Sequence, residues 1–358
     1  MLVWQSEGWC LRVVVEHGVT LSHPWVKRYL SAVPETRFDV VGIGNALVDV
    51  LSHETDDFIH KNSLVKGSMT LVDSEYSRRL YDLMGPGLEM SGGSAANTIA
   101  GVASFGGTAA YIGKVSADQL GEVFVHDLSS MGVHVVNVPS TDPSLPPTGR
   151  CLIVVTPDAQ RTMSTSLGVS ELLSIHDVSA DVIAASKVLY LEGYLWDKAP
   201  AMEAYRFAAT TAHEAGRYVA LTLSDSFCVQ RHHREFLNLV ANDVDILFAN
   251  ESELHALYGM DSLEDGLRRA MEDCAIVSVT CGPRGSIVAT AAGVEHCEAY
   301  PVSPVDTTGA GDLYASGFLY GLTQGLVPSE WGRLGALAAG EVIQHMGPRP
   351  QVSLSTFS

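Results

Sequence analysis

The sequence has few basic residues and no closely paired cysteines, and both shortages argue against whole classes of protein. Its 22 Lys and Arg residues stand against 41 Asp and Glu residues, which gives a formal net charge of -19 at pH 7. No Lys/Arg cluster offsets this acidity, so phosphate backbones would be repelled and no nucleic-acid partner is expected. The six cysteines include no Cys-x-x-Cys pair, which argues against a zinc site and favours a reducing compartment over a disulfide framework.

Long hydrophobic runs are missing as well. No stretch of about 18 apolar residues occurs, so we expect no spanning helix and no membrane partner. The first 33 residues do not combine a basic start with a long apolar core, unlike a secretory signal. We therefore expect a cytoplasmic protein.

Several familiar catalytic motifs are also absent. There is no Gly-x-x-x-x-Gly-Lys-Ser/Thr stretch, which disfavours a P-loop kinase or ATPase, and no Gly-x-Ser-x-Gly stretch, which weighs against an α/β-hydrolase. Gly42-Ile43-Gly44 follows a strand-like run, but Leu47 stands where a dinucleotide-binding fingerprint needs a third small residue.

What is present is a regular alternation of strand-like and helix-like segments from Phe38 onwards. This alternation predicts an α/β fold, a parallel sheet with helices on both faces and ligands at the carboxyl ends of its strands. Residues 1–36 match nothing that follows, and we expect an N-terminal extension, appended or poorly ordered, before a single domain over 37–354. Consecutive strand-like runs near 48–72 and 148–166 predict a small β-sheet lid.

The stretch from Thr307 to Asp312 predicts an anion site. Gly309, Ala310 and Gly311 lead into an apolar helix, and the first N–H groups of a helix lie unpaired at the positive end of its dipole. Asp312 places a proton acceptor beside that spot, which suits phosphoryl transfer to a hydroxyl. Taken alone, the same residues could form an ordinary loop-to-helix turn.

Two further groups of polar and small residues lie near strand ends. Gly92 and Gly93 permit close backbone approach to a ligand, and Asn97 is a poor helix former inside the helix that follows. Asn45 and Asp49 follow the first strand and could contact sugar hydroxyls, or could equally be a turn residue and an edge charge.

Together these stretches resemble the ribokinase (PfkB) family of small-molecule kinases over residues 38–354. Asp306 to Asp312 matches the family's C-terminal signature, and Gly92-Gly93 through Asn97, with Gly106-Gly107, matches its N-terminal one. The resemblance implies a three-layer α/β/α sandwich with a β lid. It also implies that Asp312 is the general base and that Gly309, Ala310 and Gly311 form the anion hole.

On the nucleotide side, the resemblance implies ATP as phosphoryl donor and Mg²⁺ as cofactor. Asn250 to Glu253 is similar to the family's Asn-x-x-Glu element, so Glu253 is expected to organise Mg²⁺ through water. Some members bind a monovalent cation such as K⁺, which the sequence leaves open. The predicted ATP-binding residues are Asn250, Thr280, Gly282, Gly285 and Thr307.

The acceptor is expected to be a nucleoside, adenosine first. The Asn45 to Asp49 stretch resembles the adenosine-kinase branch, in which these positions meet the ribose. Tyr194, Leu195 and Trp196, with the lid residues Leu64, Val65, Met69 and Met163, could wall a purine or could be ordinary packing. The predicted substrate-binding residues are Asn45, Asp49, Gly92, Gly93, Asn97, Arg161, Tyr194 and Asp306.

Two alternatives stay open. Arg161 resembles a lid arginine that many sugar-acting members place over their substrate, which favours a sugar kinase of the ribokinase or fructokinase type. The second alternative is a non-catalytic sensor that binds nucleotide on the same fold, although such a protein would not need Asp312 as a base. A monomer and a homodimer are both compatible with the sequence.

Overall fold

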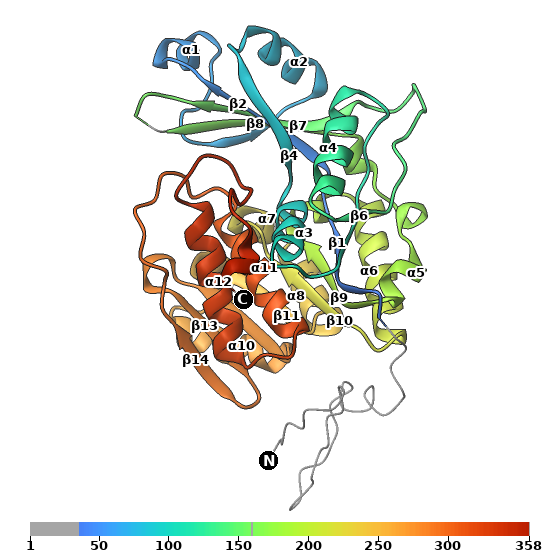
Figure 1. Ribbon diagram of the computed structural model, residues 1–358, viewed down its shortest axis with the longest axis vertical. Helices are drawn as coiled ribbons and strands as arrows, with labels where there is room; N and C mark the ends of the chain where they lie inside the picture. The colour runs from blue at the N-terminus through green and yellow to red at the C-terminus, as the bar shows by residue number, and fades with distance from the viewer. Residues whose placement is uncertain (1–35, 159, 358) are drawn as a thin grey trace, which may run out of the picture.

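The computed structural model describes residues 36–158 and 160–357. The predicted N-terminal extension, residues 1–36, therefore lies outside the described residues except for Thr36. Within the described part, the chain forms a large layered body with a smaller sheet at one end (Figure 1).

The large body is built on a nine-stranded sheet in the order β14-β13-β12-β11-β10-β9-β1-β5-β6. The strands from β6 to β12 run parallel, and β13 and β14 add an antiparallel edge. The predicted α/β fold class is confirmed. The strands are β1 (Phe38–Ile43), β5 (Ala109–Ile112), β6 (His134–Val135), β9 (Ser186–Glu192), β10 (Tyr218–Thr222), β11 (Ile246–Asn250), β12 (Ile276–Thr280), β13 (Ser286–Thr290) and β14 (Gly293–Cys297).

Helices cover both faces of this sheet, as its sequence pattern requires. Val41 and Ile43 of β1 point into one core and Val40 into the other, so this central strand is buried on both faces and mostly apolar. One face carries α5 (Ala180–Ala184), α6 (Ala199–Glu214), α7 (Ser226–Arg231), α8 (His233–Asp243), α9 (Glu251–Tyr258) and α10 (Leu263–Asp273). The other carries α3 (Ser94–Ser104), α4 (Gln119–Ser130), α11 (Ala310–Thr323) and α12 (Pro328–Val342).

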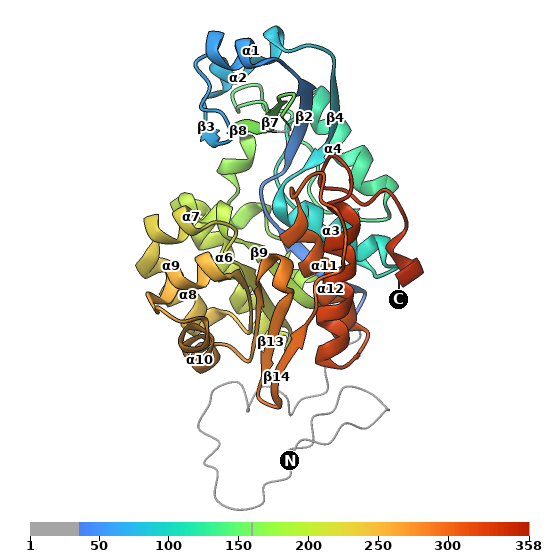
Figure 2. The same cartoon turned by 90° about the vertical axis from the view of Figure 1, so that its left-hand side faces the viewer.

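The smaller sheet is the predicted lid, and it lies beyond one end of the main sheet in both ribbon views (Figures 1 and 2). Its five strands are ordered β3-β8-β7-β2-β4. The lid differs from the prediction in two respects: the segment 48–72 contains a helix, α1, and a strand outside both predicted segments, β4, forms one edge. The elements are β2 (Leu47–His53), α1 (Asp56–Lys61), β3 (Met69–Leu71), α2 (Ser74–Leu83), β4 (Gly87–Gly92), β7 (Thr148–Val155) and β8 (Arg161–Gly168).

The two faces of the lid sheet have different partners. Val50 and Leu152 pack with residues of α1 and α2 on the outer face. On the inner face Leu51 and Ile153 pack with Met346, which belongs to the C-terminal segment of the main body. Alternation along each strand thus places one side of the lid over the carboxyl ends of the main strands.

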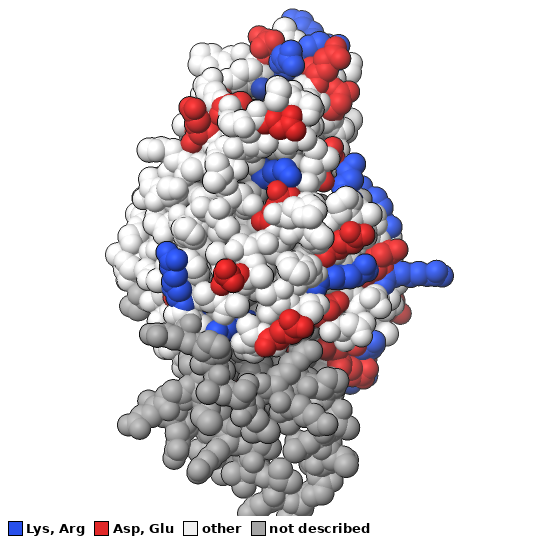
Figure 3. Space-filling model, turned by 90° about the vertical axis from the view of Figure 1, so that its right-hand side faces the viewer, with Lys and Arg blue, Asp and Glu red and all other residues white. Residues whose placement is uncertain are grey.

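Short 3₁₀ helices complete the described chain: η2 (Val169–Leu172), η3 (Ile175–Asp177), η4 (Gly193–Asp197), η5 (Gly282–Arg284) and η6 (Leu354–Phe357). None of the helices among the described residues has the length and apolar character needed to cross a bilayer. On the face drawn in Figure 3, acidic and basic side chains are intermingled, and no broad basic patch interrupts them there.

Candidate active site

Asp312 lies in the first turn of α11, where the sequence placed it. The helix begins after Gly309, whose φ of 76° is in the left-handed region and whose Cβ, if present, would lie 2.8 Å from Cβ of Pro348. A Cβ on Gly311 would meet nothing within 4 Å, so that glycine borders open space. The predicted anion hole therefore lies at the start of α11, where the N–H of Ala310 donates to the carbonyl oxygen of Thr307 at 3.3 Å and the N–H groups of a first helical turn are otherwise open to an anion.

The carboxylate of Asp312 is held by two side chains of α3. Its Oδ1 accepts a hydrogen bond from Oγ of Ser94 at 2.6 Å, and its Oδ2 accepts one from Nδ2 of Asn97 at 2.8 Å. Burial raises the pKa of Asp312, while these two bonds and the charge of Arg349 act against that rise. The half-buried carboxylate is thus fixed in direction. Ser94 was not among the predicted site residues, although it follows Gly92-Gly93 directly.

Asn97 has one further feature. Its Oδ1 is buried and has no hydrogen-bond partner among the described residues. Buried polar atoms are normally paired, and this acceptor is one of three exceptions among the side chains of the described residues.

Asp49, on β2, lies directly against the glycine turn. A Cβ on Gly92 would be 2.4 Å from the Asp49 carboxyl group, and a Cβ on Gly93, whose φ is 91°, would be 2.2 Å from the carbonyl oxygen of Asn45. The close approach of two chain segments therefore explains both glycines. Burial raises the pKa of Asp49 to about 7, with Asp312 adding to the rise and Arg349 and Arg161 opposing it.

Asn45 lies deeper than the prediction supposed. Its backbone N–H and its Nδ2 both donate to Oε1 of Glu192, at 2.7 and 2.8 Å, and its Oδ1 accepts from Oγ of Ser170. The amide group of Asn45 is therefore engaged by Glu192 and Ser170, and its predicted contact with substrate stays a prediction.

Glu192, at the end of β9, is a functional neighbour that sequence reasoning missed. Its side chain is fully buried, and its Oε2 accepts from the N–H of Ala95 at 2.7 Å, so it joins the end of β1 to the start of α3. Burial raises its pKa to about 7 despite the three hydrogen bonds that it accepts. The sequence signal that could have identified Glu192 is its position as a single acidic residue at the end of an apolar strand.

The residues that could wall a base lie partly in the main body and partly in the lid. Leu195 and Trp196 are in the main core, where the Trp196 ring packs against Tyr205 and Phe236, so of the two readings left open by the sequence the structure shows ordinary packing. Tyr194 is half-buried and donates to the carbonyl oxygen of Ser224. Among the lid residues, Leu64 packs on the outer face, Val65 and Met69 are exposed, and Met163 packs on the inner face.

Asp306 has no exposed side-chain surface. Its Oδ1 accepts from the N–H of Thr308 and its Oδ2 from the N–H of Gly347, both at 2.8 Å. It also forms an ion pair with Arg161 of β8, whose guanidinium contacts Oγ1 of Thr308. Through these contacts Asp306 holds the turn before α11, and its predicted contact with the acceptor stays a prediction.

On the predicted nucleotide side, Asn250 caps α9 and forms a capping box with Glu253. The Glu253 carboxylate accepts from the N–H and Nδ2 of Asn250 at 2.9 and 2.7 Å. Burial raises the pKa of Glu253 to about 7, and the charges of Asp225 and Asp312 raise it further. The remaining predicted ATP-binding residues are Thr280, at the end of β12, Gly282 and Gly285, at either end of the η5 turn, and Thr307, which is exposed before α11.

The described residues contain no group of three His, Cys, Asp or Glu side chains arranged to hold a metal ion. Mg²⁺ usually keeps several waters and binds through one or two carboxylates together with phosphate oxygens. A single carboxylate such as that of Glu253 is compatible with that mode of binding only through water, because both of its oxygens accept hydrogen bonds from Asn250.

Comparison with known proteins places the chain among small-molecule kinases. Residues 88–354 match the family described as "pfkB family carbohydrate kinase". Among curated proteins, the chain is 28% identical over 335 residues to an adenosine kinase of Saccharomyces cerevisiae, covering 86% of this chain and 96% of that protein. It is 31% identical over 267 residues to a 5-dehydro-2-deoxygluconokinase of Geobacillus kaustophilus, covering 70% and 78% respectively.

Solved structures give the same two kinds of relative. A probable sugar kinase from Rhizobium etli is 50% identical with a TM-score of 0.84, and an adenosine kinase from Sinorhizobium meliloti is 49% identical with the same score. Each comparison covers 90% of this chain and 98% of the other. The ribokinase-like fold expected from the sequence is confirmed.

Proposed function

Because the chain belongs to the pfkB family of carbohydrate kinases, we propose that it transfers the γ-phosphoryl group of ATP to a primary hydroxyl of a nucleoside, with adenosine as the first candidate. The family and the named relatives establish a phosphotransferase with an alcohol acceptor. The observation that carries the catalytic assignment is the Asp312 carboxylate, oriented by Ser94 and Asn97 at the entrance to α11.

In this proposal Asp312 accepts the proton of the acceptor hydroxyl as that oxygen forms its bond to the γ-phosphorus and the bond from phosphorus to ADP breaks. The backbone N–H groups of the Gly309–Gly311 turn stabilise the charge on the transferred group. Two hydrogen bonds fix the carboxylate, so its main contribution is to aim the hydroxyl at the phosphorus. The lid excludes water, which would otherwise compete as acceptor.

Magnesium would neutralise charge on the ATP phosphates, and Glu253 is the residue proposed to hold it through water. The exposed Thr307 and the η5 turn would border the nucleotide. A K⁺ ion near the anion hole remains a prediction without assigned residues.

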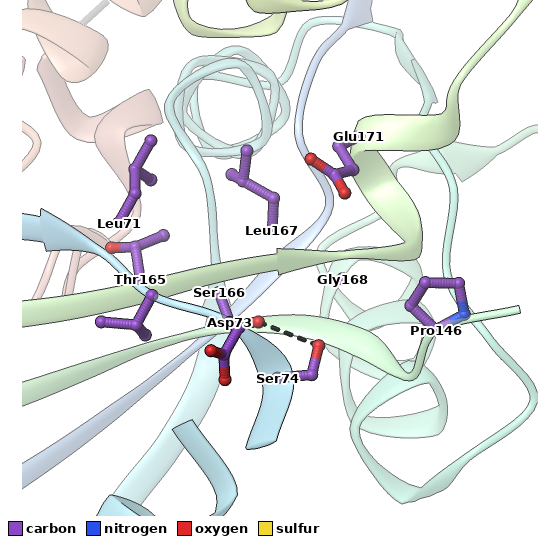
Figure 4. A pocket seen from close by; sticks show the side chains of 10 residues that line it. Leu71, Asp73, Ser74, Pro146, Thr165, Ser166, Leu167, Gly168 and Glu171 are labelled. Carbon is purple, nitrogen blue, oxygen red and sulfur yellow. Dashed lines mark hydrogen bonds between the residues drawn. The ribbon is translucent and has the colours of Figure 1, made fainter. Parts of the chain in front are cut away.

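Two features support a nucleoside as acceptor. The inner face of the lid is apolar at Leu51, Ile153 and Met163, and although Met346 packs against it in this structure, an apolar face suits a flat base better than a free sugar. A cavity of about 220 Å³ next to the end of β8 is lined by Leu71 and Leu167 and by polar side chains such as Asp73 and Glu171 (Figure 4), and it includes none of the proposed acceptor-binding residues. Asp49 and Asn97 are the polar side chains proposed to contact the ribose hydroxyls, and Oδ1 of Asn97 has no hydrogen-bond partner among the described residues.

A sugar kinase is the second candidate, because relatives of both kinds are equally similar to this chain. The sequence feature favouring it was Arg161. In the structure, however, the Arg161 guanidinium is engaged by Asp306 and Thr308, so it is not free to contact a sugar acid unless that ion pair opens.

The deciding experiment measures ADP release with adenosine, other nucleosides, ribose, fructose and 5-dehydro-2-deoxygluconate as separate acceptors. Adenosine should give the highest kcat/KM. The Asp312→Asn variant, purified in parallel, controls for contaminating kinases. A sugar with a higher kcat/KM than every nucleoside would overturn the acceptor assignment, and no acceptor-dependent turnover would overturn the proposed function.

A further inference from the structure

Arg349 is a buried cation that is bonded to uncharged groups beneath the candidate active site. Its side chain is only 7% exposed. Nε and Nη2 donate to the carbonyl oxygen and Oγ of Ser91, both at 3.1 Å, and Nη1 donates to the carbonyl oxygen of Ala96 at 2.6 Å. Ser91 and Ala96 lie on either side of Gly92-Gly93, so the guanidinium spans the turn from β4 to α3.

The location of this cation needs an explanation, because burying a charge is costly unless other charges compensate for it. The three carboxylates that compensate for it electrostatically are those of Asp49, Asp312 and Asp127. Asp127 accepts a hydrogen bond from the N–H of Ser91 at 2.8 Å, so it supports the same turn from α4. The other two carboxylates are the ones proposed to contact and activate the acceptor.

The residues immediately before Arg349 contact the other half of the site. The N–H of Gly347 donates to Oδ2 of Asp306, and Pro348 fills the space beside Gly309. Three consecutive residues therefore contact the turn before α11, the start of the anion hole and the turn before α3. This segment fixes the two glycine turns relative to each other.

We propose that Arg349 is a positioning residue for phosphoryl transfer: it fixes the first turn of α3, which presents Ser94 and Asn97 to Asp312, and its positive charge compensates the carboxylates of Asp49 and Asp312. The inference rests on the assignment of Asp312 as base. The guanidinium does not touch the acceptor; it acts through α3 and through its field.

The electrostatic effect proposed for Arg349 can be attributed to this residue because few cationic side chains act on the carboxylates of Asp49 and Asp312. Arg349 is the charged side chain that lowers the pKa of Asp312, and Arg349 and Arg161 both lower that of Asp49. Loss of the Arg349 charge should therefore raise both pKa values and move the acid limb of activity to higher pH. The other titratable groups coupled to the two carboxylates are Cys151 of β7, Tyr190 and Glu192 of β9, Tyr194 of η4 and Glu253 of α9.

The test compares Arg349→Met and Arg349→Lys with the unmodified protein, measuring kcat and acceptor KM from pH 5 to 9. Arg349→Met should lower kcat on the order of tenfold or more and change KM less. It should also move the acid limb upward by about one pH unit. Arg349→Lys keeps the charge without the planar fork, so it should restore the acid limb but only part of kcat.

Arg217→Met is the matched control. Arg217 is also buried and donates to a carbonyl oxygen, that of Ala184. Because it directly precedes β10, it lies at the amino ends of the parallel strands, whereas the site lies at their carboxyl ends. This variant should lower thermal stability while kcat and the acid limb stay unchanged. If Arg349→Met does not fold, as judged by circular dichroism and binding of an ATP analogue, Arg349→Lys decides by its kcat.

An unmoved acid limb in folded Arg349→Met, or full kcat in Arg349→Lys, would refute the inference. Asp312→Asn, assayed in the same series, separates this failure from failure of the proposed function. A fully active Asp312→Asn would remove the base assignment, whereas an inactive Asp312→Asn with a normal Arg349→Met would remove only the role of Arg349.

Discussion

The guanidinium of Arg161 forms an ion pair with the carboxylate of Asp306, and this contact joins β8 of the lid to the turn that precedes α11. Asp306 also accepts the N–H groups of Thr308 and Gly347, so one buried carboxylate links the lid, the anion hole and the C-terminal segment. The lid is thereby tied to the part of the main body where the phosphoryl group is proposed to be transferred.

Breaking this ion pair should destabilise the protein and impair turnover. Arg161→Met leaves the buried Asp306 carboxylate without its charged partner, a change that typically costs about 3 kcal/mol. We expect lower stability in denaturant unfolding, a lower kcat and faster limited proteolysis within the lid. Lys66→Met, which removes an ion pair with Asp56 and Asp158 on the exposed lid surface, is the control and should change none of these. Equal effects of the two variants would contradict a special role for the buried pair.

Replacing the proposed base should abolish chemistry and preserve the fold. Asp312→Asn removes the proton acceptor while retaining the shape of the side chain, and general bases typically contribute about two orders of magnitude or more. Steady-state kcat should fall by at least that factor, with ATP-analogue affinity and melting temperature close to those of the unmodified protein. Near-normal kcat in the purified variant would be incompatible with the assignment.

The glycine turn before α3 should not tolerate a side chain. Alanine at position 93 would adopt an unfavourable positive φ and would collide with the carbonyl oxygen of Asn45. Gly132 has a similar φ of 86°, but its Cβ would meet nothing within 4 Å. Gly132→Ala should therefore lower stability alone, whereas Gly93→Ala should also raise acceptor KM and lower kcat. Matching kinetics for the two variants would show that the Asn45 contact is unimportant.

The stability of the protein should depend on Glu192 between pH 5 and 7. Burial raises its pKa from 4.5 to about 7, so the folded state holds the proton more tightly than the unfolded state does. The protonated Glu192 therefore makes its full contribution to the free energy of unfolding below the unfolded-state pKa. As the pH rises from there towards 7, the free energy of unfolding falls by at most about 1.4 kcal/mol per pH unit. Denaturant unfolding at pH 5, 6, 7 and 8 should show a smaller decline in Glu192→Gln than in the unmodified protein.

Glu203→Gln, at an exposed position of α6, provides the control for this series and should follow the unmodified protein. Parallel pH dependence of Glu192→Gln and the unmodified protein would mean that Glu192 does not hold its proton more tightly in the folded state.

Local sequence was enough to predict the layered fold, the lid and the position of Asp312. Helix and strand periods are properties of neighbouring residues, and a glycine turn followed by an apolar helix places its own carboxylate at the helix start. The helix α1 was missed despite a local signal, since Thr55 caps it and Asp56 and Asp57 follow in its first turn.

The tertiary structure alone decided which side chains meet. Arg349 contacts Ala96 across 253 positions of the sequence, and Ser94 contacts Asp312 across 218. The pattern Tyr194-Leu195-Trp196 suits a binding site as well as a core, and only the packing of Tyr205 and Phe236 against Trp196 distinguishes the two. The periodicity of the sequence determines which face of its own helix or strand a side chain occupies. Its contact partner, however, is determined by how distant elements pack together, and this packing depends on the free energy of the whole core.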